Sequence, residues 1–243
     1  MRIVAVSDLH GHLPEIPPCD LLLLAGDLCP VRGGHDPLTQ SKWLAGRFRP
    51  WLDAVPAERV VGVAGNHDFV FQKAPHLVPD GLRWTYLQDS ETTERGLKVY
   101  GLPWQPEFGD WAFNANPAKM RAVAEQIPAD TDILVMHGPP RGYGDRVYRR
   151  TPRFVDGGCM KVEVAVENVG CPHLLDRVGA LGGLKLVVFG HIHSGHGVFR
   201  LERRASERRT ILANVSLVDE DYSPVYGVTP FDYAPATGEV VPA

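Results

Sequence analysis

The chain has 243 residues, of which 44% are hydrophobic and 22% are charged. These proportions are typical of a globular protein and exclude disordered, collagen-like and coiled-coil classes. The 25 Lys and Arg residues against 29 Asp and Glu residues give a formal charge of −4, so no net charge draws the chain to nucleic acid or anionic membrane. Ten histidines stand out, because histidine is the commonest metal ligand and a frequent acid–base group.

The sequence favours a cytoplasmic protein. The apolar run after Met1 is too short for a signal peptide, and the longest apolar runs, such as residues 21–25, are the size of a strand rather than of a membrane span. The four cysteines are scattered without a C-x-x-C pair, as expected of thiols in a reducing compartment. We therefore expect no membrane partner and no obligatory nucleic-acid partner.

Five short apolar runs predict buried strands, since each has four or five residues and ends at glycine or a polar residue. They cover residues 3–6, 21–25, 60–64, 133–136 and 186–189. Apolar residues three and four apart over residues 39–55 predict an amphipathic helix that Thr39 or Ser41 caps. Two more helices are expected over residues 118–127 and 173–181, each after a proline.

The second half of the chain has a different pattern. Residues 138–156 are rich in Gly, Pro and Arg and predict a long loop. Four later runs divided by turns favour a second, more antiparallel sheet. They cover residues 198–202, 210–213, 225–233 and 239–241. Because no repeat or linker interrupts the chain, we expect residues 1–243 to form one α/β domain with two sheets.

Side chains that can bind metal ions follow all five predicted strands. They are Asp8, His10, Asp27, Asn66, His67, Asp68, His137, His191 and His193. In an α/β sheet, ligands bind beyond the carboxyl ends of the strands, so these side chains can meet at one edge. A single Asp or His after a strand is more often a cap or a solvated group. Five such strand ends together, two of them with glycine directly before closely spaced ligand types, are difficult to explain by capping.

Seven of these residues predict a site for two divalent metal ions: Asp8, His10, Asp27, Asn66, His137, His191 and His193. Two Asp, one Asn and four His without Cys suit Mn, Fe, Zn, Co or Ni, and we favour Mn. Seven ligands exceed what one ion needs and serve two if one carboxylate bridges them. Such a pair supplies hydroxide at neutral pH and holds both oxygens of an in-line displacement at phosphorus, so we expect phosphoester hydrolysis.

The motifs DxH, GD, GNHD, HG and GHxH occur in this order between residues 8 and 193, and in them the sequence resembles the calcineurin-like metallophosphoesterase superfamily. The resemblance implies an α/β/β/α sandwich of two stacked mixed sheets flanked by helices. It also implies one metal ion on Asp8, His10, Asp27 and His193, and a second on Asn66, His137, His191 and the bridging Asp27. His67 would contact the phosphoryl group and protonate the leaving oxygen, and Asp68 would orient His67.

Residues 137–145 and 65–75 look most like the small metallophosphoesterase-domain-containing, class III phosphodiesterase-like branch of this superfamily. Members of that branch are associated with hydrolysis of phosphodiesters, including cyclic nucleotides. Some animal members have glycine at the position of His191, so its presence favours an active enzyme. We expect a dinuclear phosphodiesterase for small diesters that acts through a metal-bridging hydroxide. Two alternatives stay open: a phosphomonoesterase for a small metabolite or nucleotide, and a protein-binding scaffold with little turnover.

The expected substrate contacts are His12, Asn66, His67 and Arg141. If the chain stays extended, His12 points the same way as His10 and can touch a substrate phosphate. Arg141 directly follows the motif of His137 and can pair with a phosphate. The alternative for both is a solvated loop residue, and we expect the remaining arginines of residues 141–153 to lie on such a loop.

Overall fold

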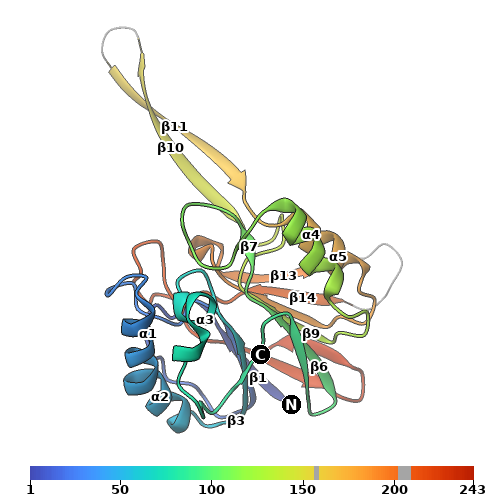
Figure 1. Ribbon diagram of the computed structural model, residues 1–243. Coiled ribbons are helices and arrows are strands. Elements are labelled where there is room, and N and C mark those ends of the chain that lie inside the picture. The colour runs from blue at the N-terminus through green and yellow to red at the C-terminus, as the bar shows by residue number, and fades with distance from the viewer. Residues whose placement is uncertain (156–158, 202–208) are drawn as a thin grey trace.

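The computed structural model describes residues 1–155, 159–201 and 209–243, and they build two six-stranded mixed sheets flanked by helices (Figure 1). The first sheet has the order β16 (Glu239–Pro242), β15 (Thr229–Ala234), β1 (Arg2–Val6), β2 (Cys19–Ala25), β3 (Ala57–Val63), β4 (Thr85–Tyr86). The second has the order β13 (Gly197–Leu201), β14 (Thr210–Asn214), β12 (Leu186–Phe189), β9 (Ile133–Met136), β6 (Leu97–Leu102), β5 (Ser90–Glu94). The expected fold class is confirmed.

Successive side chains of a strand point to opposite faces of its sheet, so the core has one part between the two sheets and another between the sheets and the helices. In β1, Ile3 and Ala5 join the apolar cluster between the sheets, whereas Val4 and Val6 belong to the cluster beneath the helices. The first sheet is covered by α1 (Pro37–Trp43), α2 (Arg49–Ala54) and α3 (Phe69–Lys73), and the second by α4 (Pro117–Gln126) and α5 (Pro172–Ala180) (Figure 1). Both strand faces are thus buried, which explains why the central strands are continuous apolar runs.

The helix expected over residues 39–55 begins earlier and is divided. It begins at Pro37, where the Asp36 side chain accepts the Thr39 N–H at 2.9 Å. Between α1 and α2 lies a π-helical turn, Leu44–Phe48, after which the Arg49 N–H donates to the Leu44 carbonyl. Pro50 has no N–H and its ring would clash with a carbonyl four residues earlier, so the wider turn relieves a clash. The two helices expected after prolines lie within one residue of α4 and α5.

The five predicted strands are present but belong to two different sheets. Strands β1, β2 and β3 lie in the first sheet, whereas β9 and β12 lie in the second. The expectation of a more antiparallel second sheet was wrong, because β6, β9, β12 and β14 are parallel and only the edge strands β5 and β13 are antiparallel. The last two strands, β15 and β16, complete the first sheet instead, and β15 begins at Thr229 rather than at residue 225.

The loop expected over residues 138–156 was also wrong beyond residue 145. Strand β10 (Arg146–Val155) pairs with β11 (Cys159–Asn168) in a hairpin that projects from the body of the protein (Figure 1). Val162, Val164 and Val166 alternate with other residues in β11, and β-branched side chains favour an extended strand. The hairpin was missed because valines separated by single residues form no continuous apolar run.

Two short strands, β7 (Gln105–Pro106) and β8 (Asn114–Ala115), pair in parallel, and β7 lies near the base of the hairpin (Figure 1). Short 3₁₀ helices occupy Pro75–Leu77 and His193–Gly195.

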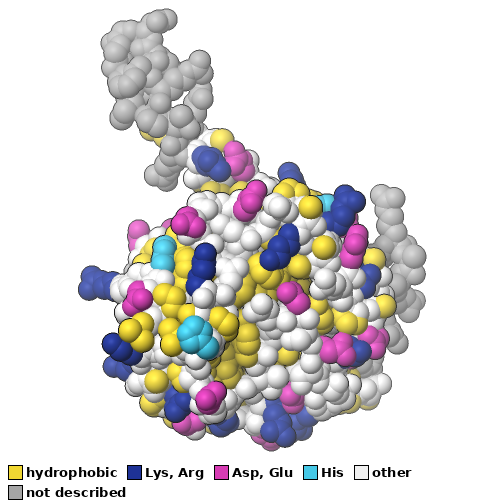
Figure 2. All heavy atoms as spheres, in the orientation of Figure 1, with side chains coloured by type: hydrophobic (Ala, Val, Ile, Leu, Met, Phe, Trp, Pro, Cys, Tyr) yellow, Lys and Arg dark blue, Asp and Glu magenta, His cyan; other side chains and the backbone are white. Residues whose placement is uncertain are grey.

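Acidic and basic side chains are interspersed over the face of the molecule shown in Figure 2, as expected from the nearly equal numbers of acidic and basic residues. Among the helices of the described residues, each is too short or too polar to cross a membrane.

Candidate metal centre

The carboxyl ends of the two sheets are joined at one point. Ser7, which follows β1, pairs with Ser216, which follows β14, and its N–H donates to the Val215 carbonyl at 2.8 Å. The expected single edge is therefore built from both sheets. It brings together all seven candidate ligands, of which only His191 is partly exposed. Asp8, His10, Asp27 and Asn66 follow strands of the first sheet, and His137, His191 and His193 follow strands of the second.

Tight backbone turns place the ligands. Asp8 and Asp27 have φ of 53°, His10 has 43° and His191 has 71°, a region that side chains other than Gly, Asn and Asp rarely adopt. Such strain at a cluster of polar groups is typical of functional sites. Glycines are required directly beside them, since a Cβ on Gly190 would overlap the Asp8 carboxylate and one on Gly65 would overlap that of Asp27. The glycine in two of the motifs thus has a steric cause.

The donor atoms form two groups that share Asp27. In the first, His10 Nε2 lies 3.2 Å from His193 Nε2 and 3.6 Å from Asp27 Oδ2, and His193 Nε2 lies 3.5 Å from Asp8 Oδ1. In the second, Asn66 Oδ1 lies 2.8 Å from His137 Nε2 and 2.7 Å from His191 Nδ1. His137 Nε2 is also 3.5 Å from Asp27 Oδ1, so the two oxygens of Asp27 face different groups.

Hydrogen bonds behind the ligands set their orientation. The Nδ1–H of His137 donates to the Ala25 carbonyl at 2.9 Å, and that of His193 donates to the Asp219 carbonyl at 2.9 Å. Each ring thus directs its Nε2 toward the site, the orientation that a histidine ligand needs once Nε2 has lost its proton. The Ser216 hydroxyl donates to Asp8 Oδ2 at 2.6 Å. Because neutral imidazole, amide and carboxylate donors converge without a thiolate, the site fits divalent metal ions.

The negative charges of the buried carboxylates Asp8 and Asp27 must be balanced by protons on neighbouring histidines or by bound cations. Burial would raise the pKa of Asp27, but the charge of His137 lowers it well below its usual value, so the carboxylate stays ionised. Burial would lower the pKa of His137, but the charge of Asp27 raises it to about 9. Burial would also lower the pKa of His193, but its hydrogen bond to Asp8 and the charge of Asp8 raise that pKa to about 9. Two protonated histidines therefore balance two carboxylates, and a metal ion would displace these protons.

The other two ligand histidines are neutral. Burial lowers the pKa of His10 to about 4 and that of His191 to about 3. Their lone pairs are free for a cation at neutral pH without loss of a proton.

His67 lines the cavity beside the two groups of ligands. Its backbone N–H donates to Asp27 Oδ1 at 2.7 Å, and its ring centroid is 4.6 Å from that of His10 and 4.3 Å from that of Trp111. Burial lowers its pKa, although the charge of Asp27 opposes this. Gln40 of α1 donates to the His67 carbonyl at 2.7 Å and thereby holds the loop. A buried Gln on an amphipathic helix has no sequence signal that marks it.

Asp68 has different partners from those expected. Its carboxylate accepts the backbone N–H groups of Leu28 at 3.0 Å, Cys29 at 2.9 Å and Gly65 at 2.8 Å. Within the described part of the chain, no hydrogen bond joins its carboxylate to the His67 ring. Burial and the charge of Asp27 raise its pKa to about 6. Asp68 therefore ties the loop after β2 to the loop after β3, rather than orienting His67 directly.

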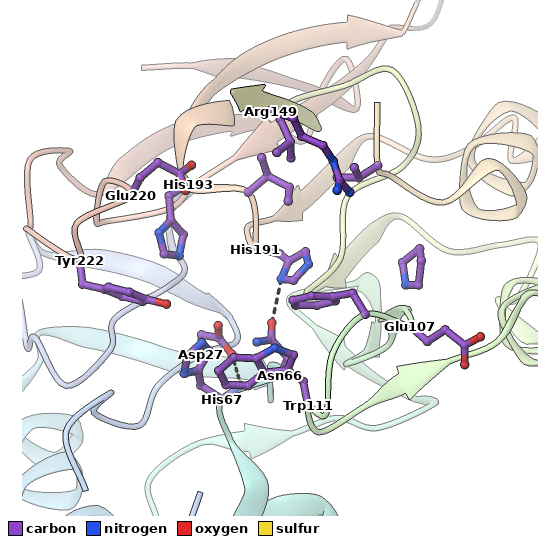
Figure 3. A pocket seen from close by; sticks show the side chains of 15 residues that line it. Asp27, Asn66, His67, Glu107, Trp111, Arg149, His191, His193, Glu220 and Tyr222 are labelled. Atoms are coloured by element: carbon purple, nitrogen blue, oxygen red, sulfur yellow. Dashed lines mark hydrogen bonds between the residues drawn. The ribbon is translucent and has the colours of Figure 1, made fainter. Parts of the chain in front are cut away.

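A cavity of about 430 Å³ opens over the ligands. Figure 3 shows Asp27, Asn66 and His67 below it, His191 and His193 above, and the Tyr222 hydroxyl directed toward its middle. Five further residues line the cavity without belonging to any sequence motif: Phe108, Trp111, Arg149, Glu220 and Tyr222.

Two expected substrate contacts lie outside this cavity. His12 Nε2 lies 3.1 Å from the Tyr222 carbonyl, and His12 borders a neighbouring hollow that His10 and Tyr222 also line. Arg141 is exposed on the loop before β10. Arg149, eight residues further along, lines the cavity in its place.

A two-sheet sandwich with buried Asp, Asn and His side chains at its joined carboxyl edge has the architecture of the metallophosphoesterase class. The profile of the calcineurin-like phosphoesterase family matches residues 1–195. The chain belongs to this family, which uses divalent metal ions.

Curated relatives agree with this assignment. Human and mouse metallophosphoesterase domain-containing protein 1 are each 32% identical over 253 residues, which cover 92% of this chain and 68% of theirs. A UPF0046 protein from Caenorhabditis elegans is 28% identical over 252 residues, 96% of this chain and 80% of its own. A probable rhamnogalacturonate lyase C from Emericella nidulans is 30% identical over 210 residues, which are 81% of this chain but 17% of the lyase.

Asp68→Asn should destabilise the protein by about 2 kcal/mol or more, since the amide cannot accept all three backbone N–H bonds and an unsatisfied buried donor costs about 1–3 kcal/mol. Urea unfolding of EDTA-treated protein, followed by circular dichroism, measures this without a contribution from metal ions. Asp53→Asn, on the exposed face of α2, is the matched control. A loss below about 0.5 kcal/mol would show that Asp68 does not hold the two loops together.

Proposed function

We propose that the protein is a two-metal phosphodiesterase for small diesters. One ion would be held by Asp8, His10, Asp27 and His193, and the other by Asn66, His137, His191 and Asp27. The observation that carries the proposal is the position of Asp27, whose Oδ2 faces His10 while its Oδ1 faces His137. Among divalent ions we favour Mn²⁺, because imidazole and oxygen donors without thiolate suit it.

When bound, two such ions would supply an activated water at neutral pH and neutralise charge on the phosphoryl oxygens. The residues of the chain have three tasks in this reaction. The ligand side chains would hold the two cations, and Asp68 and Gln40 fix the loop that carries His67. Only the protonated form of the His67 ring can give a proton to the leaving oxygen, and because burial lowers the pKa of His67 this is the minor form at neutral pH, restored by a proton from solvent after each turnover. His67 is the side chain for this task because it lines the cavity beside Asp27 and Asn66 (Figure 3).

The charges around the cavity support a diester over a monoester. Apart from the side chains that would hold the two ions, the lining carries the carboxylates of Glu107 and Glu220 and one guanidinium, that of Arg149. Arg149 is itself paired with Glu167 at 2.9 Å. A diester carries one negative charge and a monoester about two at neutral pH, so the acidic lining repels a monoester more strongly.

Metal content tests the shared carboxylate. After loading with Mn²⁺ and dialysis, the wild-type protein should retain about two ions per chain, and His193→Ala and His191→Ala about one each. Asp27→Ala should retain almost none, because both groups lose a donor. Elemental analysis measures the content, circular dichroism checks the fold, and Asp53→Ala is the control. Retention of both ions by Asp27→Ala would contradict the proposed arrangement.

Diester preference is tested with bis(p-nitrophenyl) phosphate and p-nitrophenyl phosphate at equal Mn²⁺. The wild-type kcat/KM should be at least about 10-fold higher for the diester because of the acidic lining. Asp27→Ala should lower both rates by about 100-fold or more, as expected when the main charge stabilisation is lost. Higher kcat/KM for the monoester would assign the site to monoester hydrolysis instead.

The role of His67 is tested by comparing how much the His67→Ala substitution slows esters with different leaving groups. His67→Ala should slow hydrolysis of diphenyl phosphate, whose leaving group needs a proton, by about 100-fold. Bis(p-nitrophenyl) phosphate has a stable leaving anion, so its rate should fall less than about 10-fold. His76→Ala, an exposed histidine, is the control. Equal losses on both esters would show that His67 binds the phosphoryl group without protonating the leaving oxygen.

A further inference from the structure

The loop of residues 107–113, between β7 and β8, places two aromatic rings beside the ligands. We call it the aromatic loop. Phe108 is 44% exposed, and its ring centroid lies 5.1 Å from that of His191 and 6.2 Å from that of Trp111. The ring centroid of Trp111 in turn lies 4.3 Å from that of His67. Both rings line the cavity, so an apolar surface borders a site that is otherwise polar.

Hydrogen bonds hold the aromatic loop in this position. The Asn114 side chain donates to the carbonyls of Phe108 at 3.0 Å and Gly109 at 3.2 Å, and Gln105 donates to that of Ala112 at 2.8 Å. The Ala112 N–H donates to the Asn66 carbonyl at 3.2 Å, which ties the loop to a ligand residue. A large ring kept exposed on a fixed backbone is preorganised for an apolar group of a ligand.

The opposite side of the cavity comes from the base of the hairpin and is also partly apolar. Val147 of β10 and Val169, just after β11, line it together with Arg149. Figure 3 shows Trp111 next to His67 and Asn66 on one side and Arg149 on the other. A flat group therefore has aromatic rings on one side and aliphatic side chains on the other.

The positions of His67 and His191 decide which part of a diester reaches Phe108. The leaving oxygen must lie at His67, whose ring neighbours His10 in the first group of ligands. Phe108 neighbours His191 in the second group. Among the described rings, Trp111 but not Phe108 packs against His67, so a group on the phosphorus that does not leave can reach Phe108.

We propose that the space between the aromatic loop and the base of the hairpin is a subsite for a planar aromatic group on the retained side of the phosphodiester. This rests on the proposed function and makes Phe108 a specificity-determining residue. The substrates are then diesters that carry an aryl or heteroaryl substituent, which the Phe108 ring stacks against.

Two esters with the same leaving group test the subsite in the Mn²⁺-loaded protein: phenyl p-nitrophenyl phosphate and methyl p-nitrophenyl phosphate. Phe108→Ala should lower kcat/KM for the phenyl ester about 5- to 10-fold, mostly through KM, as expected for loss of one aromatic contact. The methyl ester should change less than about twofold. Intrinsic reactivities cancel, since each ester is compared between wild type and variant.

Phe108→Tyr should restore the selectivity, and Val241→Ala, an exposed apolar residue of β16, should leave both rates unchanged. Equal losses on the two esters would overturn the subsite and assign Phe108 to the support of His191, and no loss on either would overturn it as well. Absence of turnover of both esters by the wild-type protein would contradict the proposed function itself, which distinguishes the two failures.

Discussion

The structure depends on two carboxylates, Asp8 and Asp27, that are ionised and almost fully buried. A buried charge without a partner is very costly, so positive charge must lie beside each of them. Here that charge comes from His137 and His193, whose pKa values are raised to about 9 by the same carboxylates. A metal ion bound at either carboxylate would displace the proton of the neighbouring histidine, and the converging donor atoms fit such an ion.

The fold supplies this arrangement by joining two sheets at their carboxyl ends. The pairing of Ser7 with Ser216 sets the first sheet against the second, and Ser216 also donates to Asp8. Asp68 then ties the loop after β2 to the loop after β3 through backbone N–H groups. The Ser7–Ser216 pairing and the hydrogen bonds of Asp68 align backbone segments that are far apart in sequence, so ligands from residue 8 to residue 193 can share one site.

The ligands could be predicted from the sequence because each lies within four residues of the end of a continuous apolar run. Asp27 after residues 21–25 and His137 after residues 133–136 illustrate this, since a strand buried on both faces has a clear composition and its end is easy to locate. The same reasoning could not assign strands to sheets, since periodicity carries no information on pairing. It therefore expected the five strand ends at one sheet edge, whereas β9 and β12 belong to the second sheet.

The features missed from sequence share a physical cause. In the hairpin, valines are separated by single residues, and Gln40 and Ser216 act through hydrogen bonds to residues distant in the chain, as does Asp68, whose backbone partners were not predicted. Phe108 and Trp111 become part of a cavity only through the hydrogen bonds that shape the aromatic loop. Tertiary contacts of this kind leave no local pattern, whereas a ligand at a strand end does.

The central claim is that one carboxylate serves two metal sites. Anomalous diffraction from crystals of the Mn²⁺-loaded protein tests it most directly. Two peaks about 3.5–4 Å apart are expected on either side of Asp27, one beside His10 and His193 and the other beside His137 and His191. A single peak, or two peaks of which one has no contact with Asp27, would contradict it.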